Sequence, residues 1–211
     1  MLYLASKSPR RQELLLQIAQ QFELVSASID EIPQSGESAR HFVGRMAIEK
    51  AQAGYNNLIN INAGDMVLGA DTVVVNAGNI LGKPDSFEHY LQMLTSLSNK
   101  QHQVLTAIAI IKAEQPELTK ASDVTVSKAQ TILSEVVSTE VHFKELSPEE
   151  ISQYWQTGEP QDKAGGYGIQ GIAGKFVKSI NGSYSAVVGL PLYETEQLLL
   201  NAKKINKKGL L

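Results

Sequence analysis

The amino-acid sequence predicts an α/β fold, because strand-like and helical patterns alternate along the chain. At 211 residues and 43% hydrophobic content, the chain is long enough to bury one sizeable core or two small lobes. No internal repeat or low-complexity tract interrupts the alternation. We therefore expect a single domain over residues 1–211, with an outline of two lobes.

The first elements surround a serine-rich turn. Residues 2–6 form a short apolar run, which predicts a strand. Ser8 is then a good N-cap and Pro9 suits the first helical position, so a helix is predicted over 8–21. A second short strand is expected at 22–27.

The middle of the chain carries the longest patterns. An apolar stripe at helical spacing predicts a helix over 38–54, opening at a serine and closing at a glycine. The nearly continuous apolar run at 66–76 is typical of a strand that is covered on both faces. A serine-led helix at 86–98 and strands at 103–112 and 131–144 follow.

Residues 114–130 are polar and predict an extended loop or ribbon between those last two strands. The Asn181-Gly182 pair predicts a tight hairpin turn. The C-terminal part is expected to contain a helix, a strand and a second helix, at 147–157, 175–180 and 191–204.

Composition excludes several classes of function. The net charge of −3 gives no global field that favours nucleic acid or an anionic membrane. The absence of cysteine excludes thiolate chemistry, and the four histidines lack the spacing of zinc ligands. No signal segment or run long enough to span a bilayer is present. We therefore expect a cytoplasmic protein that binds neither nucleic acid nor membrane.

Three cations surround the start of the first predicted helix. Lys7, Arg10 and Arg11 share a turn whose free N–H groups carry the positive end of the helix dipole. Arginine forks match phosphate oxygens bidentately, so this turn suits a polyanion such as a triphosphate. An ordinary capped helix with solvated charges is the alternative that the segment alone leaves open.

Asp71 lies in the middle of the apolar strand at 66–76. A carboxylate without partners is costly to remove from water, so Asp71 must be paired, bound to a metal, open to a cleft or protonated. Beside a cationic phosphate site it could hold a divalent cation or deprotonate a water. Alternatively Gly69 marks a bend, and Asp71 emerges at a strand end as a structural acceptor.

Two lysines could reach the same space. Lys50 continues the apolar stripe of the helix at 38–54, so it points toward the core side. Lys83 follows a predicted hairpin after the Asp71 strand. If the stripe borders a cleft, both ammonium groups could bind phosphate. The alternative for Lys50 is a side chain that extends to solvent, and for Lys83 a solvated hairpin lysine.

The segment 166–171 matches the G-x-G-x-x-G spacing of dinucleotide-binding proteins, but it leads into a strand where that motif requires a helix. What remains is a glycine-rich loop whose backbone can approach a ligand closely. Lys163 offers charge, Tyr167 stacking, and Gln170 an amide that can read a pyrimidine edge. A plain cluster of β-turns is the alternative.

Together these segments resemble the Maf family of nucleoside triphosphate pyrophosphatases over nearly the whole chain. Each motif alone is weak, but seven in fixed order are specific. They are Leu4-Ala5-Ser6-x-Ser8-Pro9-Arg10-Arg11-x-Glu13-Leu14-Leu15, Glu49-Lys50-Ala51, Gly69-Ala70-Asp71-Thr72, Gly82-Lys83-Pro84, Asp162-Lys163-Ala164-Gly165, Tyr167-Gly168-Ile169-Gln170-Gly171 and Asn181-Gly182-Ser183-Tyr184 with Val187-Val188-Gly189-Leu190-Pro191. The resemblance implies a mixed, twisted sheet flanked by helices, with two lobes around a central cleft, as in Maf and ITPase-like folds.

The resemblance also implies a reaction. A nucleoside triphosphate would be hydrolysed between its α and β phosphates, giving the monophosphate and pyrophosphate, with Mg²⁺ or Mn²⁺. The proton acceptor would be Asp71, which would also contact the metal, and Glu31 would be a further acidic residue beside the metal or water. The substrate-binding residues would be Ser6, Arg11, Lys50, Lys83 and Lys163.

The specificity positions of the family fall on Arg10, Thr72 and Gln170, which resemble the branch that acts on dTTP and UTP. In the sister branch, which acts on 7-methylguanosine triphosphate, these positions tend to be an aromatic residue, glutamine and glutamate. Glutamine suits the alternating acceptor and donor of a uracil or thymine edge, whereas glutamate suits the N–H donors of guanine.

Two further expectations follow from the resemblance, and one competing hypothesis stands beside them. The protein would be a homodimer, and it could remove modified nucleotides such as 5-methyl-UTP or pseudo-UTP in a house-cleaning role. The competing hypothesis is a non-catalytic nucleotide sensor that regulates cell division and septum formation. The chain departs from the family in a longer insertion around 121–130, which puts the oligomer geometry in doubt more than the chemistry.

Overall fold

The computed structural model describes residues 1–19, 21–115 and 130–205, and its centre is a mixed seven-stranded sheet. The strand order is β2-β1-β3-β5-β6-β7, with β4 beside the far end of β3. Strands β2, β1 and β3 are parallel, and the remaining pairs are antiparallel. The strands are β1 Leu2–Leu4, β2 Glu23–Leu24, β3 Met66–Asn76, β4 Asn79–Leu81, β5 Gln101–Ala113, β6 Gln130–Phe143 and β7 Val177–Asn181. The predicted α/β class and mixed sheet are confirmed.

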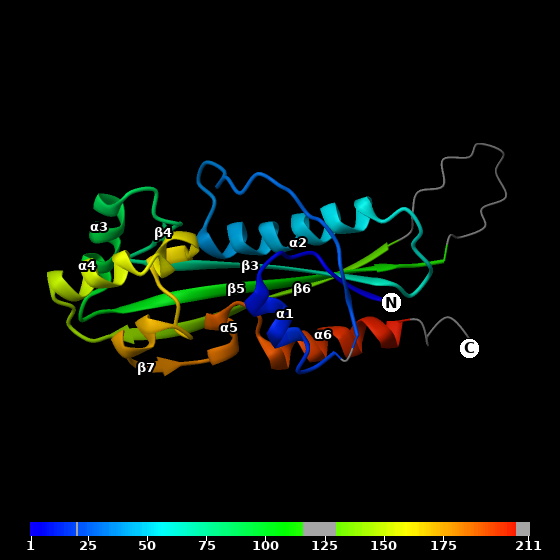
Figure 1. Cartoon of the computed structure of the whole chain (residues 1–211). Helices are drawn as coiled ribbons and strands as arrows, with labels where there is room; N and C mark the ends of the chain where they lie inside the picture. Colours follow the sequence, from blue (N-terminus) through cyan, green and yellow to red (C-terminus); the bar gives the residue numbers. More distant parts are fainter. Residues whose placement is uncertain (20, 116–129, 206–211) are drawn as a thin grey trace.

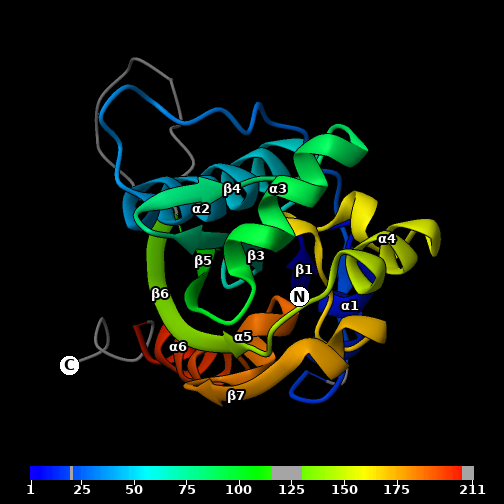
Figure 2. The ribbon, with the colours of Figure 1, turned by 90° about the vertical axis from the view of Figure 1, so that its left-hand side faces the viewer.

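Helices cover both faces of this sheet (Figures 1 and 2). Helix α2 packs on one face, and α5 and α6 lie on the other, while α3 and α4 gather at the end that carries β4. The helices are α1 Pro9–Leu15, α2 Ala39–Asn57, α3 Phe87–Leu97, α4 Pro148–Gln156, α5 Tyr184–Val188 and α6 Leu192–Lys204, with 3-10 turns at Glu159–Asp162, Ala164–Gly166 and Ile172–Phe176. No helix in the described ranges is long and apolar enough to cross a membrane.

The edge of β3 that faces β1 and β4 has a gap in its pairing. Strand β1 pairs with β3 as far as Leu68, and β4 pairs with it from Val74 onward. Within the described residues, 69–73 therefore have no strand partner on this edge. Side chains of odd-numbered β3 residues such as Val73 join the core under α2, whereas Ala70 joins the core on the opposite face. Residues in this gap therefore direct their side chains to both faces of the sheet.

The N-terminal elements are shorter than the sequence predicts. Helix α1 ends at Leu15 where the pattern predicted 21, and the strand predicted at 22–27 is only Glu23–Leu24. After α1 the chain continues in turns, with Ile18 N–H bonded to the Leu15 carbonyl. Ile18 packs against the core beside α6, so tertiary packing draws these residues out of the helix.

The expectation of a hairpin at Asn181-Gly182 is wrong, because β7 leads into the short helix α5. Gly182 has a φ of +129°, and a Cβ there would meet Thr139 Oγ1 at 2.9 Å. Ser183 then caps α5, since its Oγ accepts from Ala186 N–H. Most of the predicted loop at 114–130, including 121–129 of the insertion at 121–130, lies outside the described residues, and Gln130 begins β6.

Candidate active site

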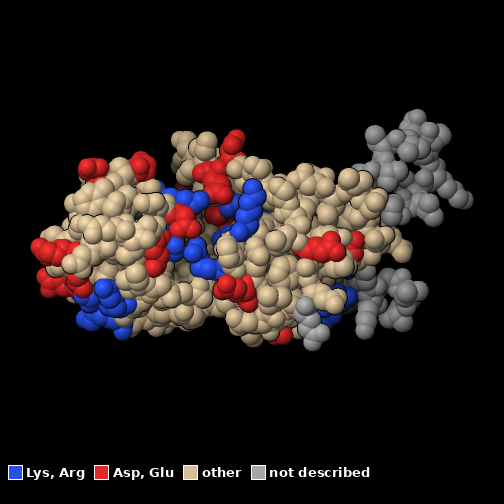
Figure 3. Space-filling view, viewed as in Figure 1, with Lys and Arg blue, Asp and Glu red and all other residues tan. Residues whose placement is uncertain are grey.

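A pocket of about 720 Å³ lies at the unpaired edge of β3, between α1, α2 and the segment 159–171. In the space-filling view, lysine and arginine side chains gather in a hollow in the middle of the molecule, with acidic residues beside them (Figure 3). Every site residue predicted from the sequence lines this pocket. The residues come from segments that are far apart in the chain, so the fold assembles one site from them.

Lys50 and Asp71 form the centre of the pocket. The ammonium of Lys50 donates to Asp71 Oδ1 at 2.6 Å and also pairs with Glu31 Oε1 at 2.7 Å. Asp71 is only 7% exposed, so the partner that a carboxylate in an apolar strand requires is Lys50. Burial raises the pKa of the Glu31 carboxyl, but the hydrogen bond and charge of Lys50 outweigh it and hold that pKa below its usual value.

Gly69 brings Lys50 to Asp71. A Cβ on Gly69 would lie 2.4 Å from the Ala47 carbonyl oxygen and 2.5 Å from the Ala51 nitrogen, both in the backbone of α2. Only glycine therefore allows α2 to approach β3 this closely. The expected alternative, that Gly69 merely marks a bend, does not account for this contact.

Arg45 of α2 forms hydrogen bonds with the loop that carries Glu31. Its Nη2 donates to Glu37 Oε2 at 2.7 Å and to the Ile32 carbonyl at 3.0 Å, and its Nε donates to Glu37 Oε1 at 2.8 Å. Such bidentate pairs fix geometry as well as charge. Glu31 is thereby presented to the pocket although it belongs to a segment without helix or strand.

Arg11 approaches the pocket from the opposite face of the sheet. Its Nε donates to the Gly189 carbonyl at 2.8 Å, and its Nη2 donates to Thr72 Oγ1 at 3.1 Å. Thr72 Oγ1 lies 3.0 Å from Thr106 Oγ1, whose hydroxyl donates to the Ala186 carbonyl at 2.7 Å. Three hydrogen bonds in series thus connect Arg11, through Thr72 and Thr106 of the sheet, to the backbone of α5.

The serines of the first turn differ from the prediction in their roles. Ser8 occupies the N-cap position of α1 but its side chain accepts no capping hydrogen bond. Instead its N–H donates to Ser6 Oγ at 3.2 Å, and Arg11 Nη1 donates to the same oxygen at 3.4 Å. Burial lowers the pKa of the Arg11 guanidinium, with the charges of Asp71 and Glu31 acting in the opposite direction.

The remaining predicted cations are placed differently from one another. Lys83 is exposed at the pocket and makes no hydrogen bond or ion pair with any described residue. Lys163 donates to the Glu159 carbonyl at 2.6 Å and to Asp162 Oδ1 at 2.8 Å, so its ammonium is already engaged. Arg10 faces Asp162 across the pocket. Burial raises the pKa of the Asp162 carboxyl, but the hydrogen bond and charge of Lys163 and the charge of Arg10 outweigh it and hold that pKa below its usual value.

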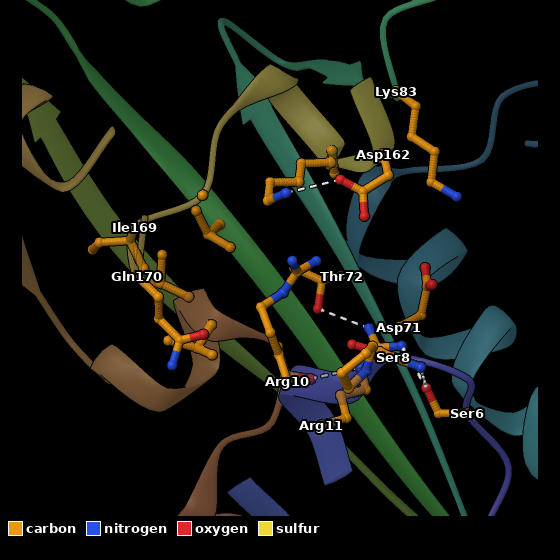
Figure 4. Close-up of a pocket in the computed structure, with 18 of the residues that line it drawn as sticks. Ser6, Ser8, Arg10, Arg11, Asp71, Thr72, Lys83, Asp162, Ile169 and Gln170 are labelled. Carbon is orange, nitrogen blue, oxygen red and sulfur yellow. Dashed lines mark hydrogen bonds and ion pairs between the residues drawn. The ribbon is translucent and has the colours of Figure 1, made fainter. Parts of the chain in front are cut away.

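The pocket has two distinct ends (Figure 4). Asp71 and Lys83 lie toward one side, while Ile169 and Gln170 lie on the other, with Arg10 between them. Gln170 is exposed, so its amide is available to a ligand. The second end is formed by the glycine-rich loop. This loop leads into the 3-10 turn at Ile172–Phe176 and then into β7, so it is not followed by the α-helix that a dinucleotide-binding motif requires.

Sequence reasoning missed several residues of the site. Thr106 is a fully buried polar group inside an apolar strand, and that contrast was a readable signal. Glu159 and Asp162 line the pocket. Asp162 was quoted only as part of a motif and was given no role, and nothing in the local sequence distinguishes Glu159 from an exposed acidic residue of a turn. Arg45 likewise resembles any solvated helix arginine. Their roles depend on partners that are remote in sequence.

The fold and the site define an α/β protein with a pocket suited to an anionic ligand, lined by six lysine and arginine residues and four carboxylates. Residues 1–202 match the family model described as Maf-like protein. The chain therefore belongs to the Maf family, as its motifs indicated.

Similar proteins carry a consistent name. A dTTP/UTP pyrophosphatase of Colwellia psychrerythraea is 54% identical over 202 residues, covering 95% of this chain and 88% of that protein. A dTTP/UTP pyrophosphatase of Vibrio parahaemolyticus is 50% identical, covering 94% of this chain and 95% of the relative. One from Shigella dysenteriae is 49% identical over 208 residues, covering 98% and 95% respectively.

Proposed function

We propose that this protein hydrolyses dTTP and UTP between the α and β phosphates, releasing the monophosphate and pyrophosphate. The observation that carries the proposal is the Lys50–Asp71 ion pair at the unpaired edge of β3, with Arg11 facing the same space. A buried acid–base pair in a cationic pocket suits phosphoanhydride hydrolysis. Relatives at about 50% identity that are named dTTP/UTP pyrophosphatase support the same substrate class.

The two ends of the pocket suggest how a nucleotide lies. The triphosphate would occupy the end with Lys50, Lys83 and Arg11, where three cations converge. The base would extend toward Gln170, whose amide can donate to one pyrimidine carbonyl and accept from the ring N–H. Arg10 lies between these ends and would contact the substrate near its middle.

In the proposed mechanism Asp71 accepts a proton from the water that attacks phosphorus. Lys50 holds the Asp71 carboxylate in place through the 2.6 Å hydrogen bond. Arg11 and Lys83 stabilise the negative charge that develops on the phosphate oxygens, and the bonds from Arg11 to Thr72 and Gly189 fix its guanidinium before substrate arrives.

The residues also fit a divalent cation. Asp71 and Glu31 both direct a carboxylate oxygen at Lys50 Nζ, so the two acids face one point. Mg²⁺ commonly binds one or two carboxylates and completes its shell with water and substrate phosphates. Within the described part of the chain no three His, Asp or Glu side chains form a metal-binding group, which is compatible with such a shared shell. Bound there, Mg²⁺ or Mn²⁺ would supply Lewis-acid polarisation of phosphate oxygens.

The decisive experiment is pyrophosphate release from a panel of nucleoside triphosphates, with and without Mg²⁺ or Mn²⁺. We expect turnover of dTTP and UTP, little turnover of GTP and ATP, and loss of activity in EDTA. Binding of UTP without release of pyrophosphate would instead support the competing hypothesis, a nucleotide sensor that acts in cell division.

The same panel tests the finer parts of the proposal. The house-cleaning role predicts turnover of 5-methyl-UTP and pseudo-UTP, because both modifications leave the N–H and carbonyl groups of the pyrimidine edge in place. The proposal places the enzyme in the cytoplasm, where nucleoside triphosphates are used. We also expect a homodimer, which sedimentation equilibrium would measure.

A further inference from the structure

The loop from Gly168 to Ile172 is fastened at both ends to one carboxylate, that of Glu159. At the far end, Ile172 N–H donates directly to Glu159 Oε2 at 3.1 Å. At the near end, Gly168 N–H donates to the Tyr154 hydroxyl at 3.1 Å, and that hydroxyl donates to Glu159 Oε1 at 2.8 Å. The loop itself closes through a bond from Gly171 N–H to the Gly168 carbonyl at 3.0 Å.

In these bonds both oxygens of Glu159 act as acceptors. The Tyr154 oxygen already accepts from Gly168, so its single proton must go to Glu159. The other carboxylate oxygen faces an N–H, which can only donate. A carboxylate accepts at both positions, whereas an amide would present a donor at one of them. The bonds are therefore specific for glutamate rather than for any polar side chain of that size.

Two glycines are shaped to this arrangement. A Cβ on Gly171 would lie 2.0 Å from Glu159 Oε1, so only glycine allows the loop to lie against the carboxylate. A Cβ on Gly168 would lie 2.7 Å from the Cε of Lys163. Lys163 in turn donates to the Glu159 carbonyl at 2.6 Å, which holds the backbone of the glutamate as well.

We propose that Glu159 is a positioning residue that holds the 168–172 loop in the geometry in which Gln170 meets the base of the nucleotide. The proposal rests on the proposed function, since it assigns the loop to base recognition. Both carboxylate oxygens are committed to the loop, so Glu159 acts through Gln170 and not on the phosphates. The Lys50–Asp71 pair belongs to other elements and does not depend on these bonds.

The test measures kcat and KM separately for UTP and GTP in four proteins: wild type, Glu159→Gln, Tyr154→Phe and the control Glu145→Gln. We expect Glu159→Gln to raise KM for UTP about tenfold, with kcat within about threefold, because a donor replaces one charged acceptor. Tyr154→Phe keeps the ring and loses only the Gly168 connection, so a smaller rise is expected. Glu145 is exposed and touches no part of the loop, so its variant should match wild type.

The selectivity for UTP over GTP distinguishes a positioning role of Glu159 from a general structural role. GTP gains little from a correctly placed Gln170, so the ratio of kcat/KM for UTP to that for GTP should fall in Glu159→Gln by about the same tenfold factor. An unchanged ratio, whether both substrates lose activity equally or neither does, would overturn the proposal. If Glu159→Gln fails to fold, Tyr154→Phe tests the proposal in its place. This variant keeps the Glu159 carboxylate, and the ratio of kcat/KM for UTP to that for GTP is measured in the same way.

Failure of the underlying function would look different. If the wild-type protein releases no pyrophosphate from dTTP or UTP, the proposed function is overturned before any variant is compared. If wild type is active and both loop variants keep the wild-type ratio, only the role of Glu159 is overturned. Circular dichroism and thermal unfolding of each variant confirm that folded proteins are being compared.

Discussion

The hydroxyl groups of Thr72 and Thr106 lie 3.0 Å apart, and the direction of their hydrogen bond is determined by its neighbours. Thr106 donates to the Ala186 carbonyl, which can only accept, so its one proton is used. Thr72 must therefore donate to Thr106 and accept from Arg11. Thr72 has no proton left for a ligand, and its main effect is to orient the Arg11 guanidinium.

This chain of hydrogen bonds predicts that Thr106, which does not line the pocket, affects catalysis. Thr106→Val keeps the shape but leaves the Thr72 proton without an acceptor, so Arg11 loses orientation. We expect kcat/KM to fall about tenfold for UTP and GTP alike, because the buried hydrogen bonds of Thr106 to Thr72 and to the Ala186 carbonyl are both lost. Thr106→Ser keeps the hydroxyl and should recover most of the activity. Equal activity of the valine and wild-type proteins would contradict this role.

Asp71→Asn should keep the fold and lose most turnover. The amide has nearly the shape of the carboxylate but cannot take a proton from water, and general-base catalysis is worth roughly 10²- to 10⁴-fold. The measurement is pyrophosphate release at saturating UTP. Asp85→Asn is the matched control, since Asp85 is exposed and lies outside the pocket. Equal rates in Asp71→Asn and wild type would rule out Asp71 as the proton acceptor.

Substitutions of Lys50 and Lys83 should both lower activity, but only that of Lys50 should lower the free energy of unfolding substantially. Lys50→Met removes the partner of a carboxylate that is 7% exposed, so the free energy of unfolding should fall by roughly 2–4 kcal/mol in addition to the loss of activity. Lys83→Met removes an exposed cation that has no hydrogen-bond or ion-pair partner among the described residues, so activity should fall while stability changes by less than about 0.5 kcal/mol. Urea unfolding and pyrophosphate release, measured on both variants, check the contrast.

Gln170→Glu should weaken the use of UTP relative to GTP. The glutamate keeps the acceptor but loses the amide donor that meets a pyrimidine carbonyl, whereas a guanine edge offers N–H donors to the carboxylate. The quantity to compare is the ratio of the two kcat/KM values. A ratio equal to that of wild type would count against base reading by Gln170.

His102 predicts a loss of stability in mild acid. Burial, together with the charge of His142, lowers the pKa of His102 from 6.5 to about 4. The unfolded chain therefore takes up a proton near pH 6.5 that the folded protein refuses until about pH 4, so stability falls as pH falls through this window. Between pH 7.5 and 5 the contribution is about 2 kcal/mol.

Urea unfolding of wild type and His102→Gln at both pH values isolates this effect, because the variant lacks the titrating group. The relevant quantity is the difference in pH dependence, and a parallel dependence in the two proteins would contradict the prediction. His102 bonds the hydroxyl of Tyr167 at 2.8 Å beneath the pocket, so the same window should affect the glycine-rich loop.

The amino-acid sequence is enough to predict the kinds of helices and strands and the chemistry of the short motifs. Apolar periodicity places the long β3 and β5 strands and the α2 helix correctly, because each pattern is set by local spacing alone. The family was readable as well, since its motifs are contiguous residues. The cost of a carboxylate in an apolar strand singled out Asp71, but the sequence left open whether it is paired, bound to a metal, open to a cleft or protonated.

Which residues come into contact depends on the folded chain. The early end of α1 and the helix in place of a hairpin after β7 arise from packing against distant residues, which no local pattern records. The same holds for Glu159 and Thr106. Glu159 and Thr106 matter because of hydrogen bonds to groups that are remote in the chain or belong to the backbone. A linear sequence pattern contains neither the distance nor the direction of such bonds.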